Sequence, residues 1–333
     1  MHGTERDATI LARAIARRAP LAGRADLTAH RLVHGAADGA PGLAVDRYGD
    51  TAVVHAETPH VLARWLPTLR HGLGLPAGYT KLHPRQASRL SAAERAARSP
   101  ETPAWGSPRE RVVVTEGGAC YEIRPPAGLS VGLFLDMREV RAWLQTVAAG
   151  RRILNLFAYT CDFGVVAGRG GAARVLNIDL SRAALAWGQT NYTLNGLLPD
   201  PHDFVYGDAL DWLGRFVRRG ERYDLVVLDP PSFSTTRAGA FSVAADYPRL
   251  AALATRVVAP GGILLAATNH AGTAGDRFDG WLQAAATDAG RRGRLAWRWH
   301  EPEPDFPIAP LAPGPPGPPG HGPYLKVRAL ELT

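Results

Sequence analysis

The chain has 333 residues, of which 46% are hydrophobic and 21% are charged, which is typical of a folded protein with a large buried core and about two domains. No apolar run approaches about 18 residues and residues 1–22 are rich in charge, so the composition argues against a membrane span and an export signal. The two cysteines, Cys120 and Cys161, argue against a disulfide framework or a cysteine-built zinc site, predict no metal, and suit a reducing cytoplasm.

The N-terminal third is expected to form a small α+β domain over residues 1–110. Its predicted elements are a helix over Thr4–Arg18, strands over Gly42–Arg47 and Thr51–His55, a helix over Pro59–Leu73, and a loop or short helix over Ser88–Glu110. A hairpin over Val112–Val114 and Ala119–Arg124 then leads into the second domain, residues 111–333.

Apolar runs alternate with helical segments in the second domain. The expected strands are Ile153–Phe157, Val175–Ile178, Phe204–Tyr206, Leu225–Leu228, Ile263–Ala267, Leu295–Trp299 and Tyr324–Leu330. This alternation predicts an α/β fold, a doubly wound and mainly parallel seven-stranded sheet with helices on both faces. The proline-rich segment Pro302–Pro323 predicts an extended mobile loop, which could cover a substrate or serve as a passive connector.

The net charge of +7 favours a nucleic-acid partner, because clustered cations attract a phosphate backbone. Of the 38 basic residues, however, only Lys81 and Lys326 are lysines, so arginine enrichment could also reflect a GC-rich genome. The candidate RNA contacts, each of which could instead be a solvated surface charge, are His83, Arg85, Arg89, Arg109 and Arg111.

The segment Asn155–Asp179 has the layout of an adenosyl-nucleoside site. An apolar strand breaks into a turn, a glycine-rich segment follows, and a second strand ends at Asp179. An acid about 20 residues past the first turn can accept both ribose hydroxyls, although Asp179 could merely end a strand. The turn over Ala158–Gly164 lacks the glycine pattern that brings backbone N–H groups close to a pyrophosphate, so S-adenosylmethionine (SAM) fits better than NAD.

The sequence Asp229-Pro230-Pro231-Ser232-Phe233 follows another apolar strand. Two prolines cannot continue a ladder, so they leave carbonyl groups as rigid acceptors for a substrate amino group, with Phe233 available to stack on a planar ring. An ordinary strand-ending turn is the alternative interpretation. The segment follows Asp179 and Asp208 in the chain, and this order favours a role in the site over an ordinary turn.

Five segments together carry a resemblance to a known family: Gly132–Leu144, Leu154–Leu197, Asp229–Phe233, Asp246–Leu250 and Pro260–Asn269. Over residues 128–270 the chain resembles class I SAM-dependent methyltransferases, and specifically the branch of the bacterial 23S ribosomal RNA methyltransferases. Asp38–Asp50 also looks like the small domain that precedes the catalytic one in that branch. The resemblance implies that the cofactor pocket is bordered by Phe134, Asp136, Arg138, Arg141, Asn155, Phe157, Tyr159, Thr160, Asp179, Leu180, Asp208, Ala209 and Asp229.

Within that pocket, Asp179 is expected to bind the ribose, and Asp208 with Ala209 the adenine. Arg138 and Arg141 would pair with the carboxylate tail of the cofactor. The segment around Asp136 could instead be a capped helix start with its cations outward.

Methylation of cytosine C5 requires a cysteine thiolate that adds to the neighbouring ring position. The positions where cytosine-specific members of the family carry cysteine are here Ser232 and the segment Ala267–His270. Asn269 resembles the asparagine segment of the guanine-N-methylating relatives, and His270 could orient a base or take a proton. Either residue could instead cap the strand end.

The sequence therefore predicts a cytoplasmic SAM-dependent methyltransferase that acts on ribosomal or other structured RNA without a cysteine nucleophile. The residues expected at the acceptor site are Asp229, Pro230, Pro231, Ser232, Phe233 and Asn269. A homodimer is possible. The alternatives are a methyltransferase for a small molecule or a protein, and a SAM- and RNA-binding module without catalysis.

Overall fold

The computed structural model describes residues 2–83, 91–236, 239–308 and 324–333. The chain forms two compact units, one of residues 1–136 with 302–321 and the other of residues 137–301 with 322–333. The units divide after Asp136 rather than at the predicted 110/111, so the hairpin of β5 (Val112–Glu116) and β6 (Ala119–Ile123) belongs to the first unit.

The first unit contains a four-stranded sheet in the order β1-β2-β3-β4. The two predicted helices are present as α1 (His2–Arg17) and α3 (Pro59–Gly72), and the two predicted strands as β2 (Leu43–Tyr48) and β3 (Thr51–Ala56). The strands β1 (Ala29–His34) and β4 (Ala77–Leu82) and the helices α2 (Ala19–Ala22) and α4 (Ala92–Arg98) complete the unit. Strands β3 and β4 are parallel, which requires the crossover that α3 supplies. The buried core joins α1 and α3 to the sheet and includes Leu11, Val45, Val54, Trp65 and Leu69.

The second unit contains a seven-stranded sheet in the order β14-β15-β13-β10-β7-β8-β9, which confirms the predicted fold class. Its strands are β7 (Arg152–Leu156), β8 (Arg174–Asp179), β9 (Phe204–Tyr206), β10 (Tyr223–Leu228), β13 (Val258–Thr268), β14 (Gly293–Trp299) and β15 (Lys326–Leu332). The adjacent strands β9, β8, β7, β10 and β13 are parallel, whereas β15 is antiparallel to both β13 and β14.

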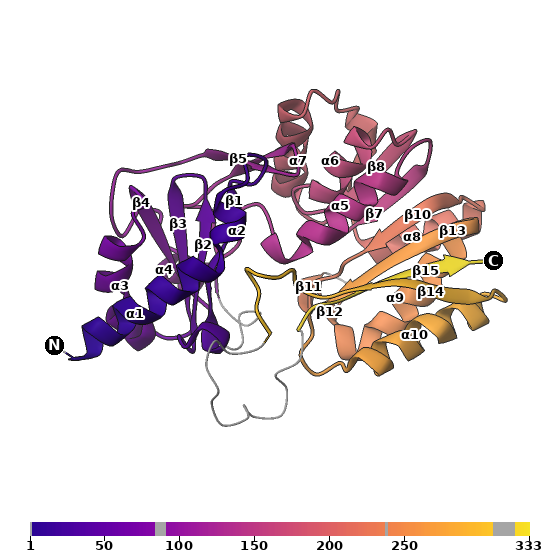
Figure 1. The fold of residues 1–333 in the computed structure, drawn as a ribbon. Helices are drawn as coiled ribbons and strands as arrows, with labels where there is room; N and C mark the ends of the chain where they lie inside the picture. The colour runs from indigo at the N-terminus through magenta and orange to yellow at the C-terminus, as the bar shows by residue number, and fades with distance from the viewer. Residues whose placement is uncertain (1, 84–90, 237–238, 309–323) are drawn as a thin grey trace. The chain divides into compact units, whose positions relative to one another are not determined.

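Two layers of helices cover this sheet (Figure 1). One consists of α5 (Arg138–Val147), α6 (Asp162–Arg169) and α7 (Arg182–Leu194), and the other of α8 (Ala209–Arg219), α9 (Val243–Val257) and α10 (Gly275–Asp288). A small hairpin of β11 (Phe233–Thr236) and β12 (Gly239–Ser242) follows β10. In a parallel sheet of this kind, the loops after the strands meet at the carboxyl edge, where ligands bind. No described helix is long and apolar enough to cross a bilayer.

Candidate active site

The loop after β7 has an unusual backbone conformation. Phe157, Tyr159 and Cys161 have φ angles of 59°, 47° and 60°, a left-handed conformation that costs non-glycine residues about 1–3 kcal/mol each. Such strain persists only where the surrounding structure enforces it, and it clusters at ligand sites. The loop is anchored by the buried Thr160, whose carbonyl accepts a hydrogen bond from Asn191 Nδ2 at 3.0 Å.

Asp179 ends β8 and faces this loop. Its Oδ2 accepts from the backbone N–H of Tyr159 and its Oδ1 from that of Ser181, both at 2.8 Å. Burial raises the pKa of the Asp179 carboxyl, although these N–H donors act in the opposite direction. The backbone N–H of Leu180 also stabilises the ionised carboxylate. A carboxylate has about four acceptor positions, so Asp179 keeps capacity for a ligand hydroxyl.

The end of β9 supplies a second wall at the same edge. Asp208 accepts hydrogen bonds from Leu210 N and Asp211 N through Oδ1 and caps α8, which begins at Ala209. Gly207 has a φ of 155°, and a Cβ there would lie 2.4 Å from Trp212 Nε1. A side chain at position 207 would therefore collide with the Trp212 ring unless that ring moved, and the φ angle also favours glycine.

Two exposed apolar side chains flank these carboxylates. Leu180 is 41% exposed and Tyr206 is 47% exposed, and the Arg182 guanidinium lies 4.2 Å from the Tyr206 ring centroid. Leu180 was a predicted cofactor contact, whereas Tyr206 was not. An aromatic residue directly before Gly207-Asp208 is the signal that could have indicated it, since an exposed ring suits a planar base.

A hydrogen bond joins the segment that follows β10 to the residue that follows β13. Ser232 Oγ donates to Asn269 Oδ1 at 2.6 Å. The structure thus brings together two residues that the sequence places in the acceptor site but separates by 37 positions. Pro230 is buried and Pro231 is exposed. The backbone of Phe233 begins β11, and its side chain lies outside the described residues.

Tyr247 on α9 stabilises the strand end that precedes Asn269. It is fully buried, and its hydroxyl donates to the Ala267 carbonyl at 3.1 Å. Burial raises the pKa of the Tyr247 hydroxyl well above its usual value, so the group stays a donor at neutral pH. It anchors the end of β13 two residues before Asn269.

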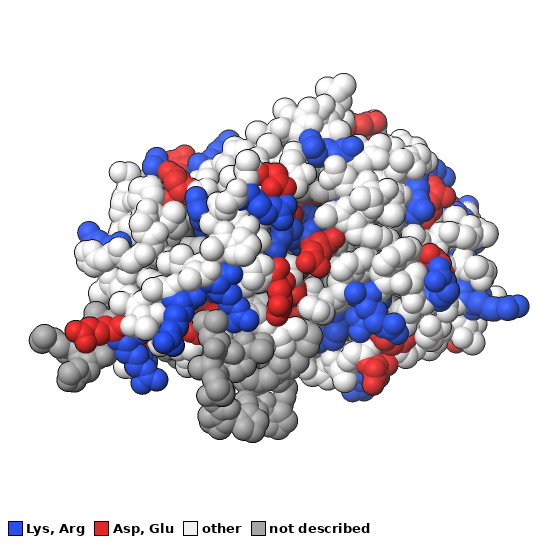
Figure 2. All heavy atoms as spheres, in the orientation of Figure 1, with Lys and Arg blue, Asp and Glu red and all other residues white. Residues whose placement is uncertain are grey.

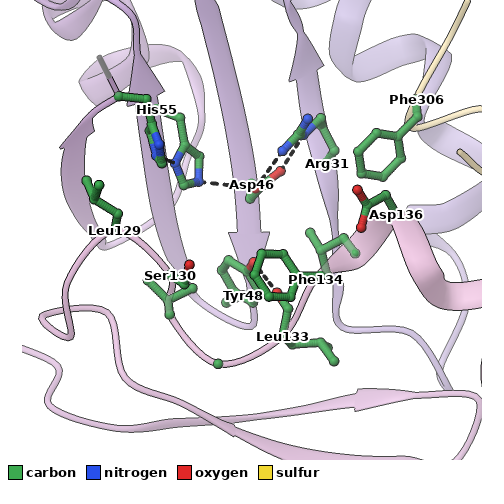
Figure 3. Close-up of a pocket in the computed structure, with 14 residues that line it drawn as sticks. Arg31, Asp46, Tyr48, His55, Leu129, Ser130, Leu133, Phe134, Asp136 and Phe306 are labelled. Atoms are coloured by element: carbon green, nitrogen blue, oxygen red, sulfur yellow. Dashed lines mark hydrogen bonds and ion pairs between the residues drawn. The ribbon is translucent and has the colours of Figure 1, made fainter. Parts of the chain in front are cut away.

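The two arginines predicted near the cofactor tail are both buried on α5. Arg141 is 1% exposed and pairs with Asp162 at 2.6 Å, so a carboxylate at the start of α6 already balances its charge. Asn155 lies within β7, where its Nδ2 donates to Asn177 Oδ1 at 2.9 Å. The cofactor roles of Arg138, Arg141 and Asn155 stay predictions. Phe134 and Asp136 belong to the first unit, where they line the pocket drawn in Figure 3. Their cofactor roles also stay predictions.

The cysteines are poorly placed for nucleophilic catalysis. Cys161 is fully buried, and burial, followed by the charges of Asp179 and Asp162, raises the pKa of its thiol well above the usual value. A thiol with a raised pKa is a weak nucleophile. Cys120 lies on β6 of the first unit. Among the described residues, no group of three or more His, Cys, Asp or Glu side chains could hold a metal ion.

Comparison with known proteins identifies the family. A family model of S-adenosylmethionine-dependent methyltransferases matches residues 86–313. The chain belongs to this family. It is an enzyme that uses SAM, as the arrangement of Asp179 and its neighbouring loops predicts.

Curated relatives cover most of the chain. A ribosomal RNA large subunit methyltransferase of Deinococcus radiodurans is 36% identical over 291 residues, which are 84% of this chain and 70% of that protein. The ribosomal RNA large subunit methyltransferase I of Aeromonas salmonicida is 31% identical over 286 residues, with the same coverage of 84% and 70%.

A solved structure shares the fold. The methyltransferase SMU.776, crystallised in complex with S-adenosylhomocysteine (SAH), superposes with a TM-score of 0.85 at 25% identity, over 98% of this chain and 81% of that one. The described site fits a SAM molecule because it offers acceptors for a diol at Asp179 and exposed apolar side chains for a planar base at Leu180 and Tyr206. It also lacks the glycine-lined loop that a pyrophosphate would require.

Proposed function

We propose that this SAM-dependent methyltransferase modifies a base of RNA, with ribosomal RNA as the favoured substrate, and that it does so without a cysteine nucleophile. The names of the relatives from Deinococcus radiodurans and Aeromonas salmonicida support the RNA substrate. The hydrogen bond between Ser232 and Asn269 is the observation that carries the mechanism, because it builds a polar acceptor site where a cytosine-C5 enzyme needs a thiol.

When bound, SAM supplies an electrophilic methyl group. A nitrogen acceptor reacts with such a group by in-line displacement, so the protein contributes mainly by orienting the acceptor and excluding water. By accepting from Ser232, Asn269 Oδ1 leaves the Nδ2 group of the amide free to donate to a base. The two prolines have no N–H, so we expect the carbonyls of this segment to serve as acceptors at the same site.

The reaction itself is the direct test. Purified protein, SAM and ribosomal RNA from cells lacking the gene should yield a methylated nucleoside, identified by mass spectrometry, that is absent from the RNA before incubation. A methylated ring nitrogen or exocyclic amine supports the proposal. 5-Methylcytidine as the product overturns the cysteine-free mechanism, and transfer to protein or small molecules but not to RNA overturns the substrate.

Replacing Cys161 with serine should leave turnover within about threefold of wild type, because a buried thiol with a raised pKa takes no part in the chemistry. Single-turnover methylation and SAM titration check this, with Cys120→Ser as the matched control. Loss of turnover in Cys161→Ser at unchanged SAM affinity would restore a covalent mechanism.

The net charge of +7 predicts a salt-dependent affinity for RNA. On the face drawn in Figure 2, Lys and Arg are interspersed with Asp and Glu rather than gathered in one patch. Arg109 and Arg111, two predicted RNA contacts, pair with Asp50 and Glu122 at 3.1 and 3.5 Å. The other two arginines of that prediction, at positions 85 and 89, lie outside the described residues.

We expect RNA affinity to fall by roughly 10- to 100-fold between about 50 and 200 mM salt, as for a protein that neutralises a few phosphates. Filter binding with a ribosomal RNA fragment measures this, and SAM affinity over the same range is the control. A flat response for RNA would favour a small-molecule substrate.

Two narrower expectations remain proposals. We expect the protein to act in the cytoplasm, where the RNA substrate would be found. A homodimer also stays a prediction, which light scattering on the purified chain can test.

A further inference from the structure

The second unit contains a pocket of 180 Å³ at the edge of its sheet where strands begin. Arg152 starts β7, Arg174 starts β8 and Tyr223 starts β10, and all three line the pocket. Asp179 and Asn269 lie at the other edge, where strands end. Strand β8 runs from Arg174 to Asp179, a length of roughly 17 Å. A ligand in this pocket is therefore separate from the candidate active site.

Two arginines of the pocket lie side by side on neighbouring strands. Arg152 and Arg174 are partners in the parallel ladder between β7 and β8, so their side chains leave the sheet on the same face. Like charges at such facing positions repel one another and destabilise a sheet. An anion bound between the two guanidinium groups would remove this repulsion.

Both guanidinium groups keep N–H donors for a ligand. The Arg152 guanidinium lies 5.5 Å from the Tyr223 ring centroid, and it forms no ion pair with any residue that the structure describes. Arg174 is 52% exposed and pairs with Asp203 through Nε at 2.7 Å. Its two Nη groups have no hydrogen-bond partner in the described part of the chain. A guanidinium offers five N–H donors in a fork that matches the oxygens of a phosphate.

A third arginine and one carboxylate complete the polar rim of the pocket. Arg219, in the last turn of α8, is 65% exposed and lies 3.7 Å from Glu221. Glu221 also accepts a hydrogen bond from the Tyr223 hydroxyl at 3.3 Å. Burial, and then the charge of Glu221, raises the pKa of that hydroxyl, so it stays a donor at neutral pH. With three guanidinium groups and one carboxylate among its lining residues, the pocket favours an anion such as phosphate.

The inner wall of the pocket is apolar. Leu176 on β8 and Val205 on β9 contribute to it from the sheet, and Trp212 and Phe216 contribute from α8. Leu176, Val205 and Trp212 stay half-buried although they pack against the core beneath α8, so this part of the core is open to a ligand. Sites for single-stranded RNA combine such features, with cations along the phosphates and aromatic or apolar surface for a base.

The size of the pocket favours part of a polymer. Its volume of 180 Å³ is below the about 300 Å³ at which pockets for independent small ligands begin. One residue of a chain can place only its ring in such a space and leave its phosphate at the rim, among the arginines. A nucleotide of RNA has both groups.

We propose that this pocket is a second RNA contact, which binds one nucleotide of the substrate with its phosphate at Arg152 and Arg174 and its base against the apolar wall. The proposal rests on RNA being the substrate. Because the pocket lies at the opposite edge of the sheet from Asp179 and Asn269, it contributes affinity for a structured RNA and takes no part in methyl transfer.

Filter binding of a ribosomal RNA fragment to the full chain tests the pocket. Combining Arg152→Ala with Arg174→Ala should weaken RNA binding by about tenfold or more, because two charge-assisted contacts to phosphate are lost. The slope of log affinity against log salt should decrease by about one for each lost phosphate contact.

The matched control combines Arg294→Ala with Arg298→Ala. It removes the same charge from two exposed arginines of β14 that pair with Glu331 and Asp279, and its RNA affinity should stay within about twofold of wild type. Both double variants should keep the wild-type SAM affinity and melting temperature. An equal loss of RNA binding in the two variants would assign the effect to net charge and overturn the proposal, as would unchanged binding in the variant of Arg152 and Arg174. Should that variant fail to fold, Arg152→Gln with Arg174→Gln decides by the same criteria.

A mononucleotide distinguishes an RNA contact from a site for a free nucleotide. With SAH filling the cofactor site, saturation-transfer NMR measures UMP binding to wild type and to the double variant of Arg152 and Arg174. Weaker binding of both UMP and RNA by the variant supports the proposal. UMP binding that requires the two arginines while RNA binding does not would assign the pocket to a free nucleotide and overturn it.

RNA methylation separates this inference from the proposed function. Since the pocket is remote from Asn269, the double variant of Arg152 and Arg174 should raise KM for RNA by about tenfold at unchanged kcat. If wild type methylates RNA and the variant does so with the same KM, the pocket proposal fails while the proposed function stands. If wild type methylates no RNA, the proposed function fails, and with it the RNA role of the pocket.

Discussion

Asp179→Ala should weaken SAM binding by about 100-fold or more. The substitution removes both carboxylate oxygens from the place where the ribose hydroxyls are expected, and hydrogen bonds to a charged group are worth about 1.5–3 kcal/mol each. It also frees the Tyr159 N–H, which donates to Asp179 at 2.8 Å and helps to hold the strained loop. Isothermal titration with SAM measures the loss.

The control for Asp179→Ala is Asp203→Ala in the same unit. Asp203 pairs with the exposed Arg174 at 2.7 Å, so its removal changes the net charge equally without touching the loop after β7. Its SAM affinity should stay within about twofold of wild type, as expected for an exposed ion pair. SAM binding that survives in Asp179→Ala would show that Asp179 only ends its strand, and tighter binding of NAD than of SAM by wild type would reverse the choice of cofactor.

Asn269→Ala should lower kcat for RNA methylation by about 100-fold while leaving SAM affinity unchanged. Ser232 orients the Asn269 amide through a hydrogen bond of 2.6 Å. Without this oriented contact to the methyl-accepting base, a smaller fraction of the bound substrate is in a reactive geometry. Ser232→Ala should cost less, about tenfold, because Asn269 remains but is no longer held. Single-turnover rates with saturating SAM and RNA give both values.

Asn195→Ala serves as the control for Asn269→Ala. Asn195 lies at the C-terminal end of α7, where its side chain donates to the Asn191 carbonyl at 2.8 Å, so its loss should affect stability more than kcat. A wild-type rate in Asn269→Ala would contradict the acceptor role. An equal loss of SAM affinity would instead assign Asn269 to cofactor binding.

The sequence by itself determined the strands of the second unit and the residues at their carboxyl ends. Short continuous apolar runs such as Leu225–Leu228 and Ile263–Ala267, alternating with helical segments, are typical of a sheet buried on both faces. The breaks that follow them, at Asp179 and at Pro230-Pro231, are local effects of backbone chemistry. For this reason the confirmed fold class and the proposed cofactor-binding edge could both be predicted without knowledge of distant contacts.

The sequence did not indicate β1 or β4, because their charged residues obscure the strand pattern. Lys81 on β4 is fully buried, and its ammonium group donates to Ser99 Oγ at 2.5 Å and to the Pro125 carbonyl at 2.7 Å. Those partners are 18 and 44 residues away. A buried charge is tolerated only when such partners are in place, and pattern within a short window cannot show them.

Tertiary structure alone decided the strand order and the polar contacts. Strand β15 inserts between β14 and β13, although it follows both in the chain. Arg141 is held by Asp162 on the next helix, and the pocket of the first unit combines Arg31, Asp46 and His83 with Phe306. The reason is physical: apolar periodicity acts over neighbouring residues, whereas the partner of a buried charge or a wall of a pocket is chosen by the folded chain as a whole.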